Sequence, residues 1–313
     1  MKKMITLMLV LVMVACAAGA SATKIGICQL VEHNALAAAG EGFMAALQEN
    51  GYADAEILYE NAQGDQANIA TIADSFIADN VDLIFAIATP VAQTMAAKTV
   101  DIPIIGSAIT DYEVAKLVES NEVPGYNVSG TSDMNPVAAQ VDMAKTFAPD
   151  AKTIGFLYCS AEDNSILQIE LAKAEAEAIG LDWVEITVSN SSEVQQAVQQ
   201  IVTECDVIYI PTDNVFASAM PIVYGVTVES QIPVICGEAN MVMAGGLATI
   251  GVDYYTIGYQ AGLMAIDVLE GADITTMPVQ MPEGGTLTIN ATVAAEIGVE
   301  IPADMVEFAV EME

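Results

Sequence analysis

The chain has 313 residues and carries 42 acidic side chains against eight lysines, with no arginine, for a formal net charge of −34. A surface this acidic repels nucleic acid and anionic lipid, which excludes both as partners. Without guanidinium groups a phosphate or carboxylate cannot be held by a bidentate side chain. Any anionic group on a ligand therefore has to be bound by backbone N–H groups and hydroxyls.

The N-terminus is typical of an export signal. Residues 1–22 begin with lysines, continue with an apolar run too short for a membrane span, and end in small residues. Cleavage after Ala22 suits ordinary signal peptidase, whereas "MVAC" resembles a lipoprotein box in which Cys16 is acylated. The lone cysteine at the end of the signal favours the anchored form. We expect an exported protein, periplasmic or on the outer face of the cell membrane, with both processing routes open.

The mature chain alternates short apolar strands with amphipathic helices, the pattern of a parallel α/β sheet. The pattern predicts strands over 24–30, 55–62, 81–88 and 101–109, with helices over 37–51, 65–80 and 89–99 between them. The apolar runs are continuous rather than alternating, as expected for strands covered on both faces.

The same pattern begins again about 130 positions later. Segment 153–180 matches 24–51 in strand, loop and helix, 206–220 matches 82–96, and 231–242 matches 101–112. We therefore expect an α/β protein with two similar Rossmann-like lobes, each built on a parallel sheet.

The roughly 290 mature residues suit two domains better than one. We assign residues 23–128 and 251–281 to the first lobe, and residues 129–250 and 282–313 to the second. The chain would then cross between the lobes near residues 129, 250 and 282. This predicts a three-segment hinge with a cleft between the lobes.

Ligands of open parallel sheets bind beyond the carboxyl ends of the strands, and polar residues gather in the loops at those ends in both copies. The candidate ligand-binding residues are Gln29, Glu32, His33, Thr89, Pro90, Ala108, Thr110, Asp111, Ser160, Glu162, Asn164, Ser165, Asp213, Asn214 and Glu238. Because Thr89 precedes Pro90, it is predicted to be the N-cap of a helix. Carboxylates and helix N-termini without arginine suit a zwitterion such as an α-amino acid. Each residue could instead be a cap or a solvated turn residue.

His33 is the single histidine of the chain. The repeat places it opposite Asp163, an ordinary loop residue, which argues against catalysis. We expect His33 to be a polar rim or ring-stacking contact at the cleft, with a capping role at the start of the first helix as the alternative. One histidine and scattered cysteines do not have the spacing of a metal site, and no cofactor is expected.

Several segments resemble the ABC-transporter substrate-binding proteins of the tryptophan/tyrosine-binding-like group. They include "IGICQLVEHNAL", "IATPVAQTMAAKT", "DIPIIGSAITD" and "GEANMVMAGGLATIGVDYYTIGYQAG", and the likeness covers nearly the whole mature chain. The resemblance implies a type I periplasmic-binding-protein fold that closes on a ligand and delivers it to a membrane permease and its ATPase. It also implies an aromatic amino acid (Trp, Phe or Tyr) as ligand. We expect the protein to be a monomer.

The branched-chain amino-acid binders share that fold. There, a hydroxyl residue after the third strand and an Ala-x-Thr segment after the fourth hold the amino-acid backbone. Thr89 and the segment 108–110 occupy those places here. An acidic residue of the second lobe holds the ammonium in those proteins, a role that would fall to Glu238 or Asp213.

Other functions remain open. Cys28 and Cys159 lie near the ends of the first strands of the two lobes, as in a two-thiol amino-acid racemase. Thiols within apolar runs are more typical of buried structural residues, and the same holds for Cys205 and Cys236. The ligand could also be a solute other than an amino acid, or the lobes could feed a separate receptor as a sensor.

Overall fold

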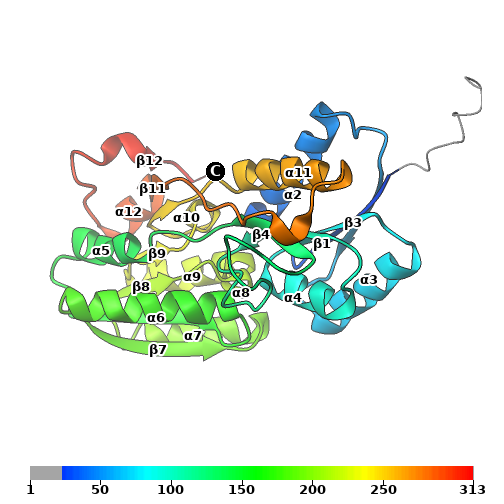
Figure 1. The fold of residues 1–313 in the computed structure, drawn as a ribbon. Helices are drawn as coiled ribbons and strands as arrows, with labels where there is room; N and C mark the ends of the chain where they lie inside the picture. Colours follow the sequence, from blue (N-terminus) through cyan, green and yellow to red (C-terminus); the bar gives the residue numbers. More distant parts are fainter. Residues whose placement is uncertain (1–22, 313) are drawn as a thin grey trace, which may run out of the picture.

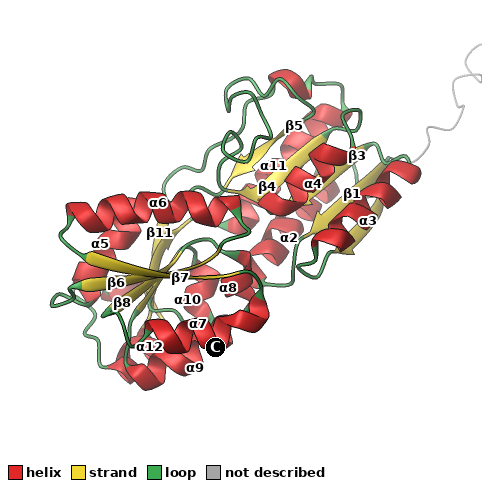
Figure 2. Cartoon of the chain, turned by 90° about the horizontal axis from the view of Figure 1, so that it is seen from below, coloured by secondary structure: helices red, strands yellow, loops and turns green. Residues whose placement is uncertain are grey.

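The computed structural model describes residues 23–312, which form two α/β lobes (Figures 1 and 2). The first sheet of this segment has five parallel strands in the order β2-β1-β3-β4-β5. Its strands are β1 (Lys24–Gln29), β2 (Glu56–Asn61), β3 (Leu83–Ile87), β4 (Ile104–Ile109) and β5 (Val128–Ser132). The helices between them are α2 (Asn34–Glu49), α3 (Gln66–Ala78) and α4 (Thr89–Lys98). The strands and helices predicted for this region are confirmed to within a few residues.

The second sheet has seven strands within the described residues, in the order β12-β11-β10-β9-β8-β6-β7. They are β6 (Thr153–Cys159), β7 (Asp182–Val188), β8 (Val207–Ile210), β9 (Val234–Cys236), β10 (Ala248–Gly251), β11 (Thr286–Asn290) and β12 (Ala309–Val310). Its helices are α5 (Val137–Phe147), α6 (Asp163–Ala178), α7 (Val194–Ile201), α8 (Asn214–Ser218), α9 (Met220–Ser230), α10 (Ala239–Met243) and α12 (Ala291–Ile297). β11 runs antiparallel to β10, so this sheet is mainly rather than wholly parallel.

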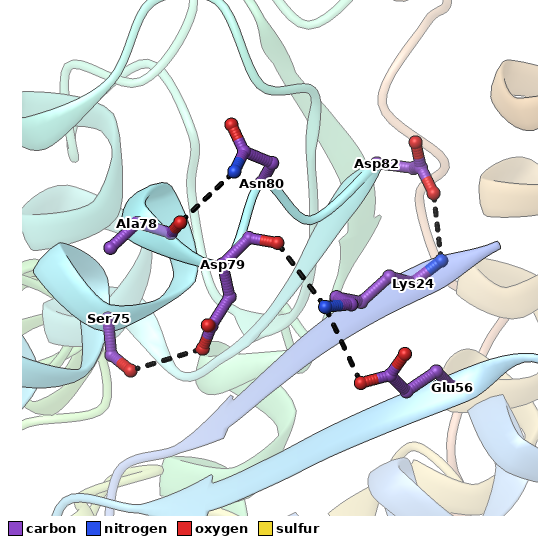
Figure 3. Close-up of polar contacts among 7 residues, drawn as sticks. All are labelled: Lys24, Glu56, Ser75, Ala78, Asp79, Asn80 and Asp82. Carbon is purple, nitrogen blue, oxygen red and sulfur yellow. Dashed lines mark hydrogen bonds and ion pairs between the residues drawn. The ribbon is translucent and has the colours of Figure 1, made fainter. Parts of the chain in front are cut away.

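The strand order confirms the internal repeat, because β7-β6-β8-β9-β10 follows the same order and direction as β2-β1-β3-β4-β5. Figure 3 shows the start of the first copy, where the Lys24 N–H donates to Asp82 at 2.8 Å and its ammonium lies 3.5 Å from Glu56. In the second copy the Thr153 N–H donates to Asp206 at 3.0 Å. In both lobes an aspartate just before the third strand fixes the start of the first.

Each sheet is covered by apolar side chains on both faces. β3 and β4 are buried along their whole length, as the continuous apolar runs predict. In the first lobe Phe43 of α2 stacks on Phe85 of β3, with ring centroids 3.8 Å apart. Burial of such apolar surface contributes about 25 cal/mol per Å² to the free energy of folding. Packing of the helices on the two faces of each sheet therefore stabilises each lobe.

Helix α11 (Tyr254–Leu269) follows β10 of the second sheet but packs on α2 in the first lobe, where Figure 1 shows it in orange beside the blue helix. Small residues make this close contact possible. A side chain at Gly258 would collide with the carbonyl of Ala39, and one at Gly42 with the carbonyl of Tyr255. The late segment of the chain is thereby fixed to the first lobe.

The chain crosses between the lobes after β5, after β10 and before β11, within the described residues. β5 pairs with β4 as the edge strand of the first sheet, so the first lobe extends to Ser132 and the boundary predicted at residue 128 lies too early. The crossings contact one another: Thr131 bridges Gln280, and Asn135 Oδ1 accepts the Val252 N–H at 2.9 Å.

Among residues 23–312, no helix is both long and apolar enough to cross a membrane. The expected export signal over residues 1–22 and the expected acylation of Cys16 lie outside the described residues. Both stay predictions.

Candidate functional site: the interlobe cavity

Polar contacts join the two lobes face to face. His33 Nε2 lies 3.2 Å from Asn214 Oδ1, and the hydroxyls of Thr110 and Thr212 lie 3.4 Å apart. At the rim, Gln93 of α4 donates to Asp163 of α6 at 2.8 Å. The lobes are therefore closed on each other.

A small cavity lies between the closed lobes. It has about 10 Å³ of space open to the centre of a water molecule. Its lining residues are His33, Leu36, Ala108, Asp133, Asn164, Thr212, Asp213, Asn214, Ala217, Glu238, Met241 and Tyr254. A space of this size holds about one water molecule, so a larger ligand requires the lobes to move apart.

Asp213 is the buried N-cap of α8 and is 1 % exposed. Its carboxylate accepts the N–H of Phe216 at 2.9 Å, the N–H of Cys159 at 2.6 Å and the hydroxyl of Ser165 at 2.8 Å. These donors belong to its own lobe, so Asp213 organises the cavity wall and is already well hydrogen-bonded.

Glu162 supports the same wall from the N-cap of α6. It accepts both the backbone N–H and the side-chain amide of Asn214, at 3.2 and 2.7 Å, and the amide of Asn164 at 3.2 Å. Burial raises the pKa of the Glu162 carboxyl to about 8, and the nearby Asp213 carboxylate adds to that rise. The carboxyl fixes the orientation of both asparagine side chains.

Glu238 is the N-cap of α10 and accepts the N–H groups of Asn240 and Met241 at 2.6 and 2.8 Å. Burial raises the pKa of its carboxyl to about 7. Those hydrogen bonds oppose the rise, and the Asp133 carboxylate adds to it. Glu238 and Asp133 are therefore close enough to interact through their charges.

Asp133 lies on the first crossing segment and is 3 % exposed. Its Oδ2 accepts the Tyr254 hydroxyl at 2.7 Å, whereas its Oδ1 has no hydrogen-bond partner within residues 23–312. Burial raises the pKa of the Asp133 carboxyl, and the hydrogen bond from Tyr254 opposes that rise. Of the carboxylates lining the cavity, Asp133 has the most unused acceptor capacity.

His33 is the N-cap residue of α2, but its side chain makes no capping hydrogen bond. The capping alternative is therefore wrong for the side chain, which reaches across to Asn214. Burial lowers the pKa of His33 to about 4, and the contact with Asn214 opposes the shift. The imidazole is consequently neutral at pH 7, as expected for a group removed from water.

Thr89 is the first residue of α4 rather than its N-cap, which corrects the prediction by one residue. The N-cap is Ala88, whose φ of 94° is rare for a residue with a side chain and is held by its N–H bond to the Ser107 carbonyl. The buried Thr89 hydroxyl has no partner within residues 23–312. The start of α4 thus presents a hydroxyl beside free helix N–H groups.

The predicted site residues fall into three sets. Those that line the cavity are His33, Ala108, Asn164, Asp213, Asn214 and Glu238. Those that support it from behind, or that bridge the lobes, are Thr110, Glu162 and Ser165. Those outside the cavity lining, in addition to Thr89, are Gln29, Glu32, Pro90, Asp111 and Ser160.

Two members of the last set have structural roles. Gln29 accepts the Tyr59 hydroxyl at 2.6 Å, and Asp111 caps a turn through the N–H of Glu113. Glu32 and Ser160 are exposed. Glu32 and Pro90 line two other hollows that are bounded by residues of both lobes.

Sequence reasoning missed the contributions of Asp133, Tyr254 and Thr212. Thr212 directly precedes the predicted Asp213, but its uncharged side chain gave no separate signal. Asp133 lies on a crossing segment, and Tyr254 begins α11 directly after another. The predicted hinge was the signal that could have identified them, because segments that pass between two lobes form the floor of the cleft between them.

A larger hollow, of about 1210 Å³ including open solvent, lies between the crossing segments and is lined by Thr131, Gln260 and residues 280–286, among others. None of its lining residues within 23–312 has a buried polar atom that lacks a partner. The smaller interlobe cavity gathers such atoms together with the buried carboxylates, so it is the candidate site.

Two lobes that close over a small polar cavity through a multi-segment hinge define a solute-binding protein. The fold is that of the type I periplasmic binding proteins. Residues 24–313 match the family of ABC transporter substrate binding proteins, and the chain belongs to this family. The family is extracytoplasmic, binds small molecules and works with an ABC permease.

Individual relatives are similar over most of their length. A tyrosine-binding protein of Clostridioides difficile (strain R20291) is 44% identical over 270 residues, which cover 85% of this chain and 78% of the relative. The crystal structure of an ABC domain from Streptococcus pneumoniae in complex with L-Trp has a TM-score of 0.90 at 38% identity, covering 93% of this chain and 99% of that one.

A third relative is a Clostridium difficile substrate-binding protein with adhesive properties, solved in its ligand-free, open form. It is 41% identical over 93% of this chain and all of that one, but its TM-score is only 0.70. Sequence identity is similar in the two solved structures, so it does not account for the lower score.

Proposed function

We propose that this protein binds an aromatic L-amino acid in the interlobe cavity and delivers it to an ABC permease. One observation carries the proposal: the cavity is lined by buried carboxylates, and no lysine lines it within the described residues. Uncompensated buried carboxylates are costly, so the cavity favours a ligand that brings its own positive charge. The tyrosine-binding and tryptophan-bound relatives support an aromatic side chain.

The two ends of the amino-acid backbone have separate candidate partners. The ammonium is assigned to Asp133, whose Oδ1 is unpartnered within residues 23–312, rather than to Glu238 or Asp213, which are occupied as helix caps. The carboxylate is assigned to the start of α4, which lies outside the lining of the closed cavity, because the Thr89 hydroxyl and helix N–H groups supply donors there without a cation.

Binding is proposed to occur without turnover. Burial raises the pKa of Cys28 and of Cys159 to about 12, the opposite of what a nucleophilic or proton-transferring thiol needs. Incubation with L-tyrosine in D₂O should give no deuterium at Cα by mass spectrometry. Incorporation that is lost in Cys28→Ala would instead support the racemase.

A calorimetric screen of the twenty amino acids and of small organic anions tests the ligand class. We expect binding with roughly micromolar dissociation constants, about −8 kcal/mol, for aromatic amino acids and at least 100-fold weaker binding for aspartate or lysine. Stabilisation only by a sugar, a purine or a peptide would overturn the amino-acid assignment and leave the family unchanged.

The remaining parts of the proposal concern the state of the exported protein. It is proposed to act as a monomer, anchored through Cys16 or released after Ala22. Light scattering of the purified protein tests the first point, and mass spectrometry of the mature N-terminus from cells distinguishes the two processing routes.

A further inference from the structure

A chain of hydrogen bonds crosses the cleft and ends on the single histidine. Glu162 accepts the side-chain amide of Asn214 at 2.7 Å, and the Asn214 oxygen lies 3.2 Å from His33 Nε2. The same oxygen, Glu162 Oε2, also accepts the backbone N–H of Asn214 at 3.2 Å, so it acts as an acceptor whether or not the carboxyl carries a proton on its other oxygen. The Asn214 amide nitrogen therefore faces Glu162 and its oxygen faces His33. Nε2 therefore carries the proton, and the neutral ring presents Nδ1 as a bare acceptor.

Nδ1 is enclosed and has no hydrogen-bond partner within residues 23–312. Asn164 lines the same cavity, and its amide nitrogen donates to the Thr212 carbonyl at 2.9 Å, which fixes the orientation of the amide. Its Oδ1 also lacks a partner within residues 23–312. With Asp133 Oδ1, the unpartnered cavity atoms are all acceptors. Buried acceptors without partners each cost on the order of 1–3 kcal/mol, so the closed cavity is complete only with a ligand that supplies several donors.

We infer that His33 Nδ1 accepts a hydrogen bond from an N–H or O–H group on the ligand's aromatic side chain, so that the protein selects tryptophan or tyrosine over phenylalanine. The inference rests on the proposed function. His33 is the specificity-determining residue, and Glu162 and Asn214 are positioning residues that fix its tautomer.

The ammonium group of the ligand and the donor on its side chain are expected to bind different protein groups. A cation is held more strongly by the carboxylate of Asp133 than by a neutral imidazole. Asp133 lies on the first crossing segment, whereas His33 lies at the start of α2, so the two acceptors approach the cavity from different elements. Leu36, Ala217 and Met241 line the same space and supply apolar contacts for a ring.

The hydrogen-bond chain joins a residue of the first lobe to two residues of the second. It can therefore form only when the lobes are closed. In the open form His33 is free to adopt either tautomer, so discrimination between side chains is made at closure.

Ligand pairs that differ by one donor test the inference on the unaltered protein. Tryptophan and 3-(benzothiophen-3-yl)alanine have nearly the same shape, but sulfur replaces the indole N–H in the second. Tyrosine and phenylalanine differ by the hydroxyl. We expect the donor-bearing member to bind about 10- to 100-fold more tightly in at least one pair, as for an unsatisfied buried acceptor. Equal affinities within both pairs would overturn the inference while leaving the proposed function intact.

A variant assigns the preference to its residue. In His33→Leu the preference for the donor-bearing ligand of the discriminated pair should fall below about threefold. The variant lacks the Nδ1 acceptor, so the donor-bearing ligand loses a hydrogen bond that the other ligand never makes. Asn34→Ala, an exposed neighbour, should keep the wild-type preference. An unchanged preference in His33→Leu would refute the role of His33. If no aromatic amino acid binds the wild-type protein at all, it is the proposed function that fails.

Nitrogen NMR covers the case in which His33→Leu does not fold. The chain has one histidine, so ¹⁵N-histidine labelling gives a single pair of ring signals. In the complex with the preferred ligand we expect the Nε2–H tautomer, with the Nδ1 signal shifted from its position in the phenylalanine complex. An Nδ1–H tautomer or a charged ring in the preferred complex would overturn the inference.

Discussion

The two sides of the cleft are built differently although the lobes repeat the same fold. On the second lobe the carboxylates of Glu162, Asp213 and Glu238 are hydrogen-bonded to donors of their own lobe. On the first lobe and the hinge, His33 Nδ1 and Asp133 Oδ1 have no partner within the described residues. Apart from Asn164 Oδ1, which also lacks a partner within residues 23–312, the second lobe presents a wall whose polar groups are already paired, and the other side is completed by what it binds.

This difference indicates how ligand and closure are coupled. A preformed wall can bind first without rearranging, since its internal hydrogen bonds already fix its side chains. The unpartnered groups of the first lobe and hinge are tolerated in water when the cleft is open and become costly on closure. A ligand that satisfies them stabilises the closed form more than the open form, as a population shift requires.

The largest expected effect comes from breaking the finished wall. Asp213→Ala leaves three buried donors unpaired, so we expect a loss of about 3 kcal/mol of stability and a Tm lower by roughly 6–12 °C. The matched change in the first lobe is Asp111→Ala, which removes an exposed cap and should cost about 0.5–1 kcal/mol. Thermal unfolding followed by circular dichroism compares them. Equal losses would contradict the difference between the two sides.

Changing the hinge carboxylate should affect binding more than folding. Asp133→Asn should weaken binding of an aromatic amino acid about 100-fold, because an ammonium loses its charged partner, with a Tm within a few degrees of wild type. Affinity for the analogue without the amino group, indole-3-propionate or its phenol counterpart, should not fall. Calorimetry measures both. Asp253→Asn, an exposed cap on the next crossing, is the control and should bind normally. Equal loss for both ligands would remove Asp133 as the ammonium partner.

The two lobes, their strands and most of the helices could be predicted from sequence, because continuous apolar runs are local signals and the repeat of about 130 residues is visible along the chain. The cavity lining was predicted only where a polar residue directly follows a strand, as for Asn164 and Asp213. Gln29 follows the same rule but turns back onto Tyr59. The direction in which a side chain points at the end of a strand depends on neighbouring strands that are distant in sequence.

Asp133 and Tyr254 could not be predicted by that rule, because they lie on a crossing segment and at the first residue of the helix after another, and the course of these segments depends on both lobes at once. The packing of α11 on α2 brings Tyr254 to the cleft, and that contact depends on small residues about 220 positions apart, such as Gly42 and Gly258. The first residue of a helix is harder to predict than the helix itself. The helix at Thr89 was expected, but its start moved by one residue because Ala88 adopts an uncommon backbone conformation.

A smaller effect should appear as a pH dependence of stability. Glu162 and Glu238 keep their protons in the folded protein up to pH about 8 and about 7, against an ordinary value of 4.5. Folded protein binds more protons than unfolded chain above pH 4.5, so stability falls as pH rises and levels off above about 8. The charged groups facing them are Asp213 and Asp133, which strengthen the effect.

His33 acts in the opposite direction, but only below its ordinary pKa of 6.5. Measurements from pH 7 to 8 also stay below the ordinary pKa of 9.0 of the buried cysteines, so they report mainly on the carboxyls. We expect the ligand-free protein to lose about 1 kcal/mol, or roughly 2–4 °C of Tm, over that range. Glu162→Gln should flatten the slope. A Tm that rises with pH over this range would mean that the carboxyls are charged or hydrated in the folded state.

The smallest effect is expected at the rim. The Gln93–Asp163 bond joins the lobes at 2.8 Å but is exposed, so water competes with it and its contribution is about 0.5–1 kcal/mol. Gln93→Ala should therefore weaken ligand binding only about two- to fivefold, through faster dissociation, because the bond forms after the ligand has entered. Gln66→Ala removes a similar exposed bond within the first lobe and should leave the dissociation rate unchanged. Stopped-flow kinetics separate the two rates. If Gln93→Ala accelerates release as much as Asp133→Asn does, the rim rather than the buried acceptors holds the lobes closed, and the contrast between the two sides of the cleft loses its functional meaning.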